Sequence, residues 1–507
     1  MTASVTVPRR WSAAMTTAIE QDLRKYLTRG DGQEDLTFLL YQTSTGATRT
    51  TALLTEIVPP QPGERLVHGN ASFTAAYFLR AAQRAAEAGL GLGLAHAHPR
   101  GRGWQRLSND DAAAERGHAT QAQILTGHPL LGITHAGKDG AYSARFWPHA
   151  TGEADPSWAE SVRVTGARFH VSHNPDLRPP DTSDARLSRT VSAWGPSAHA
   201  DLTRLRVGII GAGSVGAIIG EALARTGFRD ITIIDFDTVE PHNLDRLLNA
   251  TIADIDRGKA ELLAGAIRAH ATAPDVTVRP VPLSVVEPDG WAEALDCDVL
   301  FSCVDRPWPR YALNVAAYAH LIPVIDGGIA VDVTDGQLHG AEWRAHVAAP
   351  GRRCLECLGQ YDPGHIQTER DGLLDDPAYI AGLPADHALR RRENVFAFSL
   401  ACASLEILEL LRMSVAPSGI ADTGTSIYHW TLGTQDHDHA GCNDSCPYSG
   451  TLLARGDNTG LTVTGHHHAA EAARTATGHP HRHRGSALRT GVNAGPAPSA
   501  RPRSAHG

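Results

Sequence analysis

The amino-acid sequence predicts an α/β protein with two folded units, the second built on a doubly wound, mostly parallel sheet. Strand-like apolar stretches alternate with helix-length stretches from Leu36 to about Trp147, and again from Arg186 onward. A length of 507 residues corresponds to about three units of average size. With 42% hydrophobic and 20% charged residues, the chain has ample apolar material for more than one core.

The elements of the first unit follow from the spacing of its apolar residues. Residues 36–42 (LTFLLYQ) and 50–58 (TTALLTEIV) are rich in apolar and β-branched side chains and are predicted strands. Residues 73–89 repeat apolar positions with the period of an amphipathic helix. Residues 91–99 (GLGLAHAHP) are a buried strand that ends in a His-rich turn.

The second unit begins with a helix at Arg186 and continues with the apolar strand 206–213 (RVGIIGAG). The predicted strands and helices that follow alternate in the order expected for a doubly wound sheet. They are ITIIDFD, KAELLAGAIRAHA, VTVRPVPLS, CDVLFSCVD and YALNVAAYAHLIPVIDGG.

Composition also sets the expected domain limits. A polar, Pro-rich region separates the units, and we place an N-terminal domain at 1–160, a linker at 161–185 and the second domain at 186–450. Residues 451–507 are dominated by Gly, His, Arg, Pro and Ala, which leaves too little apolar surface to offset the ordering entropy. We therefore expect a disordered tail there, and metal scavenging by its histidines is the alternative.

Charge and cysteine usage exclude several classes of protein. The net charge of −9 argues against a global attraction to nucleic acid or to anionic membranes. No apolar run reaches the roughly 18 to 20 residues of a membrane span, and no signal peptide follows Arg9 and Arg10. Seven cysteines do not suit a disulfide framework. The sequence therefore predicts a cytoplasmic protein, and its shortage of Lys beside abundant Arg is typical of a GC-rich bacterial genome.

A group of metal-ligating residues follows the His-rich turn. His96 and His98 are one residue apart at a strand end, so both imidazoles can reach one ion. Asp111, at the start of the next helix, supplies a third ligand and leaves a fourth position for water, as in catalytic zinc sites. Glu56, at the end of an earlier strand, is the predicted general base. Ser108 would cap the helix or hydrogen-bond a developing oxyanion.

This pattern resembles the JAB/JAMM (MPN) metalloproteases, whose signature is an upstream Glu, His-x-His-Pro and Ser-x-x-Asp. The resemblance implies an MPN-type α/β domain in which His96, His98 and Asp111 hold zinc and Ser108 assists the intermediate. Asp110 is the competing carboxylate, but the spacing from Ser108 favours Asp111. The gap between His98 and Ser108 is slightly longer than in the shortest family members. The family cleaves isopeptide or peptide bonds after ubiquitin-like or sulfur-carrier C-termini.

A glycine-rich turn opens the second domain. Gly211, Gly213 and Gly216 lie between a strand and a helix, where they permit a tight turn and a close backbone approach to phosphate. Asp235 ends the next strand, where an acidic residue binds a ribose hydroxyl. On these residues alone, a nicotinamide-dependent dehydrogenase is an alternative.

The segments DFDTVEPHNLDR and CVDRPWPRYALN, with a lysine between them, depart from dehydrogenases and resemble the ThiF/MoeB family of ubiquitin-activating-type adenylyltransferases over about 186–450. By that resemblance, Asp235 binds the ribose of ATP. Asn243, Arg246 and Lys259 would hold the phosphates, and Asp305 would organise Mg²⁺. The segment RLSR resembles the family's entry helix, whose second arginine reaches the nucleotide of the partner subunit.

That arginine is Arg189, and the resemblance implies a homodimer. Arg310 and Asn314 would support the segment that carries Asp305. The residue types suit the chemistry, because attack by a carboxylate on an α-phosphate needs cations on the pyrophosphate and an acid to hold Mg²⁺.

Four cysteines form two close pairs, which in a cytosolic protein predicts a closed structural zinc site. They are Cys354, Cys357, Cys442 and Cys446. The ThiF/MoeB family commonly has such a site here, although its second pair is usually separated by two residues rather than three. Many relatives place a reactive cysteine shortly after the first pair, and this sequence has none. Cys402 lies in an apolar helix and is expected to be buried, as are Cys297 and Cys303.

Together these patterns predict an enzyme with two activities on the C-terminus of a small ubiquitin-like or sulfur-carrier protein. A zinc metallopeptidase would process that C-terminus, and the second domain would adenylate it with ATP and Mg²⁺. A ubiquitin-conjugating-type enzyme or a sulfurtransferase would be a further partner, according to the pathway. The alternative is a partly inactive scaffold that binds the ubiquitin-like protein without turning it over.

Overall fold

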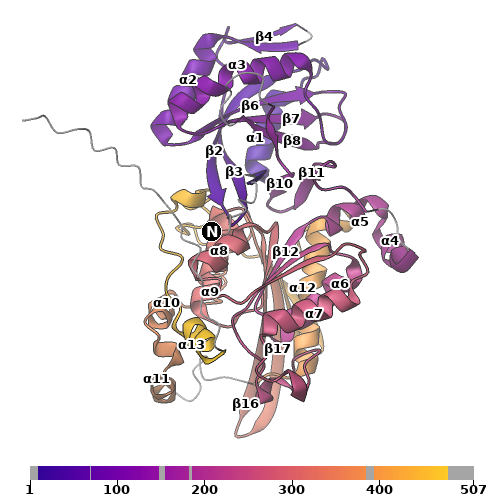
Figure 1. The fold of residues 1–507 in the computed structure, drawn as a ribbon, viewed down its shortest axis with the longest axis vertical. Coiled ribbons are helices and arrows are strands. Elements are labelled where there is room, and N and C mark those ends of the chain that lie inside the picture. The colour runs from indigo at the N-terminus through magenta and orange to yellow at the C-terminus, as the bar shows by residue number, and fades with distance from the viewer. Residues whose placement is uncertain (1–8, 69, 148–154, 182–184, 384–392, 478–507) are drawn as a thin grey trace, which may run out of the picture.

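The computed structural model describes residues 9–68, 70–147, 155–181, 185–383 and 393–477. Two sheets lie end to end, the N-terminal one above and the C-terminal one below in Figure 1. None of the described helices combines the length and apolarity that a membrane crossing requires.

The N-terminal sheet has nine strands in the order β11-β10-β1-β3-β2-β6-β7-β8-β9. Its strands are β1 (Arg10–Thr16), β2 (Leu36–Thr45), β3 (Arg49–Val58), β6 (Gly91–His98), β7 (Leu130–Ala136), β8 (Tyr142–Trp147), β9 (Ser157–Trp158), β10 (Ser161–Thr165) and β11 (His170–His173). A separate hairpin joins β4 (Arg65–His68) to β5 (Asn70–Phe73). The predicted strands at 36–42, 50–58 and 91–99 are present as β2, β3 and β6.

The domain limits differ from the expectation at the linker. Residues 161–185 are not a simple connection, because β10 pairs in parallel with β1 and antiparallel with β11. Every residue of β10 is buried. The polarity of the surrounding segment hid this strand, which contributes Val162 and Val164 to the core.

Three helices cover the N-terminal sheet. They are α1 (Thr17–Leu27), α2 (Ala75–Ala88) and α3 (Asn109–Thr126). The predicted helix at 73–89 is α2, which Thr74 caps through its side chain and Gly89 ends in the left-handed conformation. Its buried face consists of Tyr77, Phe78 and three alanines, which pack on β2 and β6.

The C-terminal sheet has eight strands in the order β14-β13-β12-β15-β16-β17-β18-β19. They are β12 (Arg206–Ile210), β13 (Asp230–Ile234), β14 (Thr277–Val281), β15 (Val299–Ser302), β16 (Val324–Thr334), β17 (Gln337–Ala348), β18 (Thr425–His429) and β19 (Thr434–Asp438). The first five in spatial order, from β14 to β16, pair in parallel, and the remaining pairs are antiparallel. The chain reverses its direction of winding between β12 and β15, which is where this type of sheet forms a ligand crevice.

Helices cover both faces of this sheet, as the doubly wound prediction requires (Figure 1). The described helices of this part of the chain are α4 (Ser188–Trp194), α5 (Pro196–Thr203), α6 (Ser214–Thr226), α7 (Lys259–His270), α8 (Pro288–Leu295), α9 (Pro307–Ala319), α10 (Pro363–Arg370), α11 (Pro377–Gly382), α12 (Phe396–Val415) and α13 (His468–Thr477). One apolar core includes side chains of α6, α7 and α12, and a second includes side chains of α8 and α9.

Residues 451–477 are folded, although the sequence predicted a disordered tail from residue 451. Trp308 Nε1 donates to the Val463 carbonyl at 2.8 Å, and Gly465 N donates to the Val286 carbonyl at 2.8 Å. The prediction failed because this segment adds a few well-placed side chains to an existing core and forms no core of its own. The rest of the predicted tail, residues 478–507, lies outside the described residues.

A buried charge network joins the two domains. Asp298, directly before β15, accepts from Arg49 Nη1 on β3 at 2.6 Å and from Arg163 Nη1 on β10 at 2.9 Å. Burial acts to raise the pKa of Asp298, but the two guanidinium groups hold it well below its usual range. Arg206 at the start of β12 pairs with Glu160 of the N-terminal domain at 2.7 Å.

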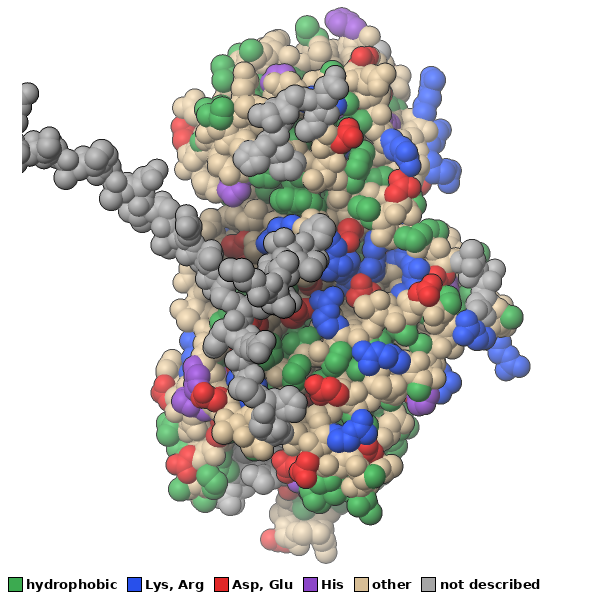
Figure 2. All heavy atoms as spheres, viewed as in Figure 1, with side chains coloured by type: hydrophobic (Ala, Val, Ile, Leu, Met, Phe, Trp, Pro, Cys, Tyr) green, Lys and Arg blue, Asp and Glu red, His purple; other side chains and the backbone are tan. Residues whose placement is uncertain are grey.

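The network is shielded from water over much of the junction. The side chains of Arg49 and Arg163 are 1% and 0% exposed. On the face shown in Figure 2, further Lys and Arg side chains gather at the level where the two domains meet. The junction is therefore a fixed, charge-bearing interface.

Replacing Asp298 with Ala should lower the free energy of unfolding by about 3 to 5 kcal/mol, because two arginines would lose their buried counter-charge. Denaturant unfolding followed by circular dichroism measures this change. Asp176→Ala is the control, since Asp176 forms an exposed pair with Arg106, and it should change stability by less than about 0.5 kcal/mol. Equal stability of the two variants would show that the network does not hold the junction.

Candidate functional site

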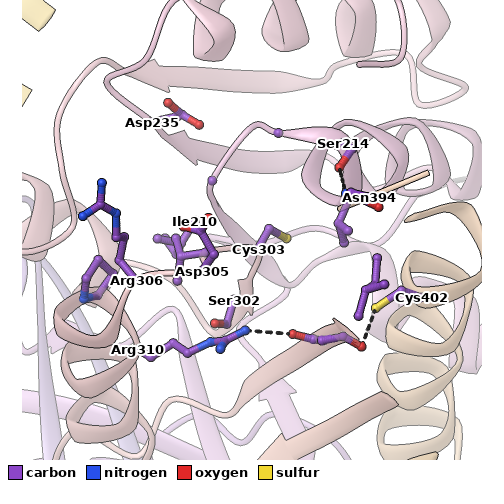
Figure 3. A pocket seen from close by; sticks show the side chains of 18 of the residues that line it. Ile210, Ser214, Asp235, Ser302, Cys303, Asp305, Arg306, Arg310, Asn394 and Cys402 are labelled. Atoms are coloured by element: carbon purple, nitrogen blue, oxygen red, sulfur yellow. Dashed lines mark hydrogen bonds between the residues drawn. The ribbon is translucent and has the colours of Figure 1, made fainter. Parts of the chain in front are cut away.

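A large cleft lies at the carboxyl ends of the parallel strands of the C-terminal sheet, where the winding reverses. Its volume is about 1540 Å³. The glycine turn after β12, the residues after β13 and β14, and the loop after β15 all line it. Figure 3 shows Asp235, Asp305, Arg306 and Arg310 around its interior. We call this the nucleotide cleft.

The glycine loop, residues 211–216, needs its glycines for different reasons. Gly211 has a φ of +99°, and a Cβ there would lie 2.5 Å from the Cys303 carbonyl oxygen. A Cβ on Gly216 would lie 1.9 Å from the carbonyl oxygen of Gly211, so this glycine lets α6 start close to the strand. Gly213 has open space around its Cα and lines the cleft. The N-terminus of α6 therefore presents its backbone N–H groups to an anion.

Asp235 is held beside the glycine loop at the end of β13. Its carboxylate accepts from Ala212 N at 2.6 Å and from Asp237 N at 2.7 Å. Burial and the nearby Asp237 raise the pKa of Asp235 to about 6, although Lys259 opposes them. The carboxylate is thus ionised near neutral pH and able to accept a ribose hydroxyl.

The predicted phosphate-binding residues line the same cleft. Lys259 Nζ pairs with Asp237 Oδ2 at 2.9 Å, which orients the ammonium at the start of α7. Asn243 accepts from Glu240 N through its side chain, and Arg246 Nη1 donates to the His242 carbonyl. The structure thereby brings Lys259, Asn243 and Arg246 to one wall of the cleft.

Asp305 lies on the loop after β15 and also lines the nucleotide cleft. Arg189, in contrast, is exposed on α4 and is not among the residues that line it. Arg310 donates to the carbonyls of Gly327 and Gln360 and lies 3.4 Å from the Asp326 carboxylate. Asn314 is fully buried and accepts from Leu355 N.

The cleft also contains an acidic group that the sequence did not indicate. Glu406 on α12 is fully buried, and burial raises its pKa well above the usual range. Its Oε1 accepts from the thiol of Cys402 at 3.6 Å. Cys402 is buried, as predicted, and burial likewise raises the pKa of its thiol. Cys297 is buried as expected, and burial raises the pKa of Cys303 although that residue is only partly covered.

The four predicted zinc cysteines come together beside α9 and β17. Their sulfur atoms all lie within 4.8 Å of one another, and Cys354 Sγ is 3.7 Å from Cys446 Sγ. Tetrahedral zinc with bonds of about 2.3 Å separates its sulfur ligands by about 3.8 Å. Backbone N–H groups of Cys354 and Cys357 donate to cluster sulfurs, which stabilises thiolates. The cluster therefore fits a structural zinc.

The predicted N-terminal ligands also meet. His96 Nε2 and His98 Nε2 are 3.2 Å apart, and they lie 3.6 and 3.5 Å from the two carboxylate oxygens of Asp111. Burial and the nearby Arg145 lower the pKa of His96 to about 3, so this imidazole is neutral and able to bind a metal. His98 Nδ1 is 3.2 Å from Gln105 Oε1, a contact that orients the ring.

Ser108 and Asp111 form a capping box at the start of α3. The Ser108 hydroxyl donates to Asp111 Oδ2 at 2.7 Å, and its oxygen accepts from Asp111 N. Burial acts to raise the pKa of Asp111, but the hydrogen bond from His98 and the adjacent His96 outweigh it and hold the pKa below its usual range. The predicted cap is confirmed, and the cluster contains Asp111 rather than the exposed Asp110.

The prediction that Glu56 serves this cluster is wrong. Glu56 is opposite Leu40 in the sheet, whereas His96 is opposite Leu36, so the two side chains are offset by about 13 Å along the strands. Glu56 instead pairs with Arg84 of α2 at 3.1 Å.

Glu34 occupies the position that was assigned to Glu56. It lies just before β2, the strand that pairs with β6. Burial and the charge of Asp111 raise the pKa of Glu34, while His98 acts to lower it. The pairing of β2 with β6 could have indicated Glu34. Leu36 is opposite His96 in these antiparallel strands, so a residue two positions before Leu36 lies near His96 and His98.

Comparison with known proteins assigns the C-terminal part of the chain. Residues 186–485 match the ThiF family. The SAMP-activating enzyme E1 of Haloferax volcanii is 30% identical over 164 residues, which cover 32% of this chain and 57% of the relative. The molybdopterin-synthase adenylyltransferase of Escherichia coli is 27% identical over 155 residues, or 31% of this chain and 59% of the relative. The chain thus spans less than two thirds of each.

The solved structure of E. coli MccB with succinimide covers 53% of this chain and 75% of its own, with a TM-score of 0.41 and 18% identity. The family match leaves the N-terminal domain, with its His96 cluster, unassigned. From the glycine loop to the four cysteines, the residues described above lie within the matched region, and the chain belongs to the ThiF family.

Proposed function

We propose that the C-terminal domain adenylates the C-terminal carboxylate of a small ubiquitin-like or sulfur-carrier protein with ATP. The observation that carries this proposal is the convergence of Asp235, Lys259, Arg246 and Asp305 on the cleft at the glycine loop. A domain that only binds a protein partner has no use for this combination of ribose, phosphate and metal-binding groups. The relatives of this chain include an activating enzyme of Haloferax volcanii and an adenylyltransferase of Escherichia coli, which agrees with the proposal.

Each residue has a role in this reaction. The glycine loop and the N-terminus of α6 bind phosphate, and Asp235 accepts from the ribose. The partner's carboxylate oxygen attacks the α-phosphorus, the bond to the β-phosphate oxygen breaks, and pyrophosphate leaves. Lys259 and Arg246 stabilise the negative charge on that leaving group. Mg²⁺ held by Asp305 would neutralise further phosphate charge.

The far end of the cleft suits an extended peptide. It continues along β16 and β17, where Ile329, Val331, Trp343 and Arg344 line it. The cysteines that line the cleft are Cys303 and Cys402, and burial raises the pKa of both thiols. Thiols of this kind are poor nucleophiles, so we propose adenylation without transfer to either of these cysteines.

We propose a zinc-dependent peptidase activity for the N-terminal domain, on a different observation. His96, His98 and Asp111 provide three ligands within 4.8 Å of one another and leave a fourth position open, as catalytic zinc sites do. Zinc held there would lower the pKa of a bound water to about 7. Glu34 would take a proton from the water that attacks the peptide carbonyl and would return it to the leaving amine, while Ser108 would hold Asp111 in place.

The two activities would act on the same class of partner, with the peptidase exposing the carboxylate that the second domain adenylates. Arg189 is exposed and free to reach a second subunit, as a homodimer would require. A ubiquitin-conjugating-type enzyme or a sulfurtransferase would receive the activated protein. The scaffold alternative predicts partner binding without turnover.

Metal content tests both clusters. A chain that ends after Thr477, which lacks the His-rich residues 478–507, should bind two zinc ions, one for each cluster. His98→Ala should lose one of them and Cys354→Ser the other, as measured by inductively coupled plasma mass spectrometry. A single zinc that only Cys354→Ser removes would show that the His96 cluster does not hold this metal.

Pyrophosphate exchange tests adenylation. Asp305→Ala should reduce partner-dependent exchange of labelled pyrophosphate into ATP by more than about 100-fold, because the loss of one metal or charge contact to the transition state costs several kcal/mol. Asp275→Ala, in an exposed loop of the same domain, is the matched control and should retain the exchange rate. Unchanged exchange in Asp305→Ala would contradict the assignment.

Substitution of Glu34 and of Glu56 shows which of these two glutamates is the general base. Glu34→Gln should abolish cleavage of a fusion that follows the C-terminus of the ubiquitin-like protein, with a loss of about 100-fold or more, and leave zinc binding intact. Glu56→Gln removes an exposed pair with Arg84 and should leave the cleavage rate within about twofold. A loss of cleavage in Glu56→Gln, with the rate of Glu34→Gln unchanged, would show that Glu56 and not Glu34 is the general base.

A further inference from the structure

The last described residues of the chain return to the nucleotide cleft. We call residues 459–477, which follow the four clustered cysteines in the sequence, the C-terminal strap. In Figure 1 the strap's helix α13 lies close to α9 and α10. Two residues of the strap, His467 and Ala469, line the cleft. A segment that lies outside the sheet and its connections therefore contributes to the site.

The strap is attached to the connection between β14 and α8. Gly465 N donates to the Val286 carbonyl at 2.8 Å. Arg474 donates two hydrogen bonds to the carboxylate of Glu287, at 2.6 and 3.0 Å. Ala470, between these two contacts, is fully buried. The residues of the strap that line the cleft therefore have a defined position next to the loop after β14.

The loop after β14 lies where the base of a bound nucleotide belongs. The neighbouring strands β12, β13 and β14 lead to the glycine loop, to Asp235 and to Leu283, in that order across the sheet. A nucleotide with its phosphates at the glycine loop and its ribose at Asp235 therefore extends its base toward the residues after β14. Phe236, Leu283 and Val285 line the cleft and supply apolar surface for a planar base.

The strap adjoins these apolar residues at two points. The ring of His467 packs edge-on against the ring of Phe236, with 5.1 Å between the centroids, and only 5% of His467 is exposed. Ala469, two residues further on, is partly exposed and lines the cleft. His467 thus supports Phe236 from behind the surface, whereas Ala469 presents its methyl group to the space in the cleft. A side chain this small forms a wall without filling that space.

We infer that the C-terminal strap completes the base subsite of the nucleotide cleft, with Ala469 in contact with the planar base of a nucleoside triphosphate and His467 holding Phe236 in position. This role rests on the proposed adenylation function, which supplies ATP as the nucleotide. The contact is apolar and takes the base alone, because the phosphates and the ribose are bound by the glycine loop and Asp235. The strap therefore adds affinity for the part of the nucleotide that the phosphate-binding residues do not reach.

Binding of ATP and of inorganic tripolyphosphate to the full chain, measured by isothermal titration calorimetry with Mg²⁺ and without a partner protein, tests this contact. Ala469→Leu enlarges the side chain at the wall and should weaken ATP binding about tenfold, because the base would be displaced from its apolar contacts. Tripolyphosphate carries no base, so its affinity should stay within about twofold. Ala472→Leu is the matched control and should bind both ligands like the wild-type chain, because Ala472 is an exposed residue of the same helix and does not line the cleft.

The two ligands distinguish a contact to the base from other effects of the substitution. An unchanged affinity for ATP in Ala469→Leu would overturn the inference and leave the proposed adenylation standing. An equal loss of affinity for ATP and for tripolyphosphate would also overturn it, because the substitution would then have disturbed the phosphate site or the fold. If the wild-type chain binds neither ligand, the proposed adenylation fails and the role of the strap fails with it.

Discussion

The buried ion pairs of Asp298 determine how the rest of the molecule is arranged. This carboxylate lies at the entry to β15 and holds Arg49 and Arg163 of the N-terminal sheet. The other end of β15 leads directly to Asp305 in the nucleotide cleft. One short strand, β15, therefore connects the domain junction to the nucleotide cleft. Because charges buried in this way are costly unless paired, the two sheets keep one relative orientation, and the His96 cluster stays at a fixed distance from the cleft.

Local periodicity was enough to predict most of the fold. The strand that ends at His98, the strand that ends just before Asp235 and the glycine turn before α6 are all where spacing placed them. The exceptions depend on contacts between distant segments. β10 looks polar in isolation, and its burial follows from pairing with β1. Residues 459–477 contribute few apolar side chains. They are ordered because they bind to the surface of the folded domain, for example through the hydrogen bonds to Trp308 and Val286.

The candidate sites show the same difference between residues that are close in the sequence and residues that only the fold brings together. The cluster of His96, His98 and Asp111, whose members lie close in the sequence, was predicted from spacing, and the three side chains do meet. Glu34 was missed because its proximity to them depends on the register between β2 and β6, which no short motif records. The position of His467 in the wall of the cleft could not be predicted for a similar reason, since it follows the glycine loop by about half of the chain. Short motifs cannot predict contacts between residues that lie far apart in the sequence.

The place of residues 459–477 in the fold has a consequence for biosynthesis. The ribosome makes a chain from its N-terminus, and domains fold as units as they emerge. The His96 cluster and the glycine loop are therefore available well before residues 459–477 have been added. A nascent chain that ends before residue 459 would carry the glycine loop, while the side of the cleft at His467 and Ala469 would still be open. The cleft would therefore be completed in two stages, with the strand ends made first and the wall at His467 and Ala469 made later.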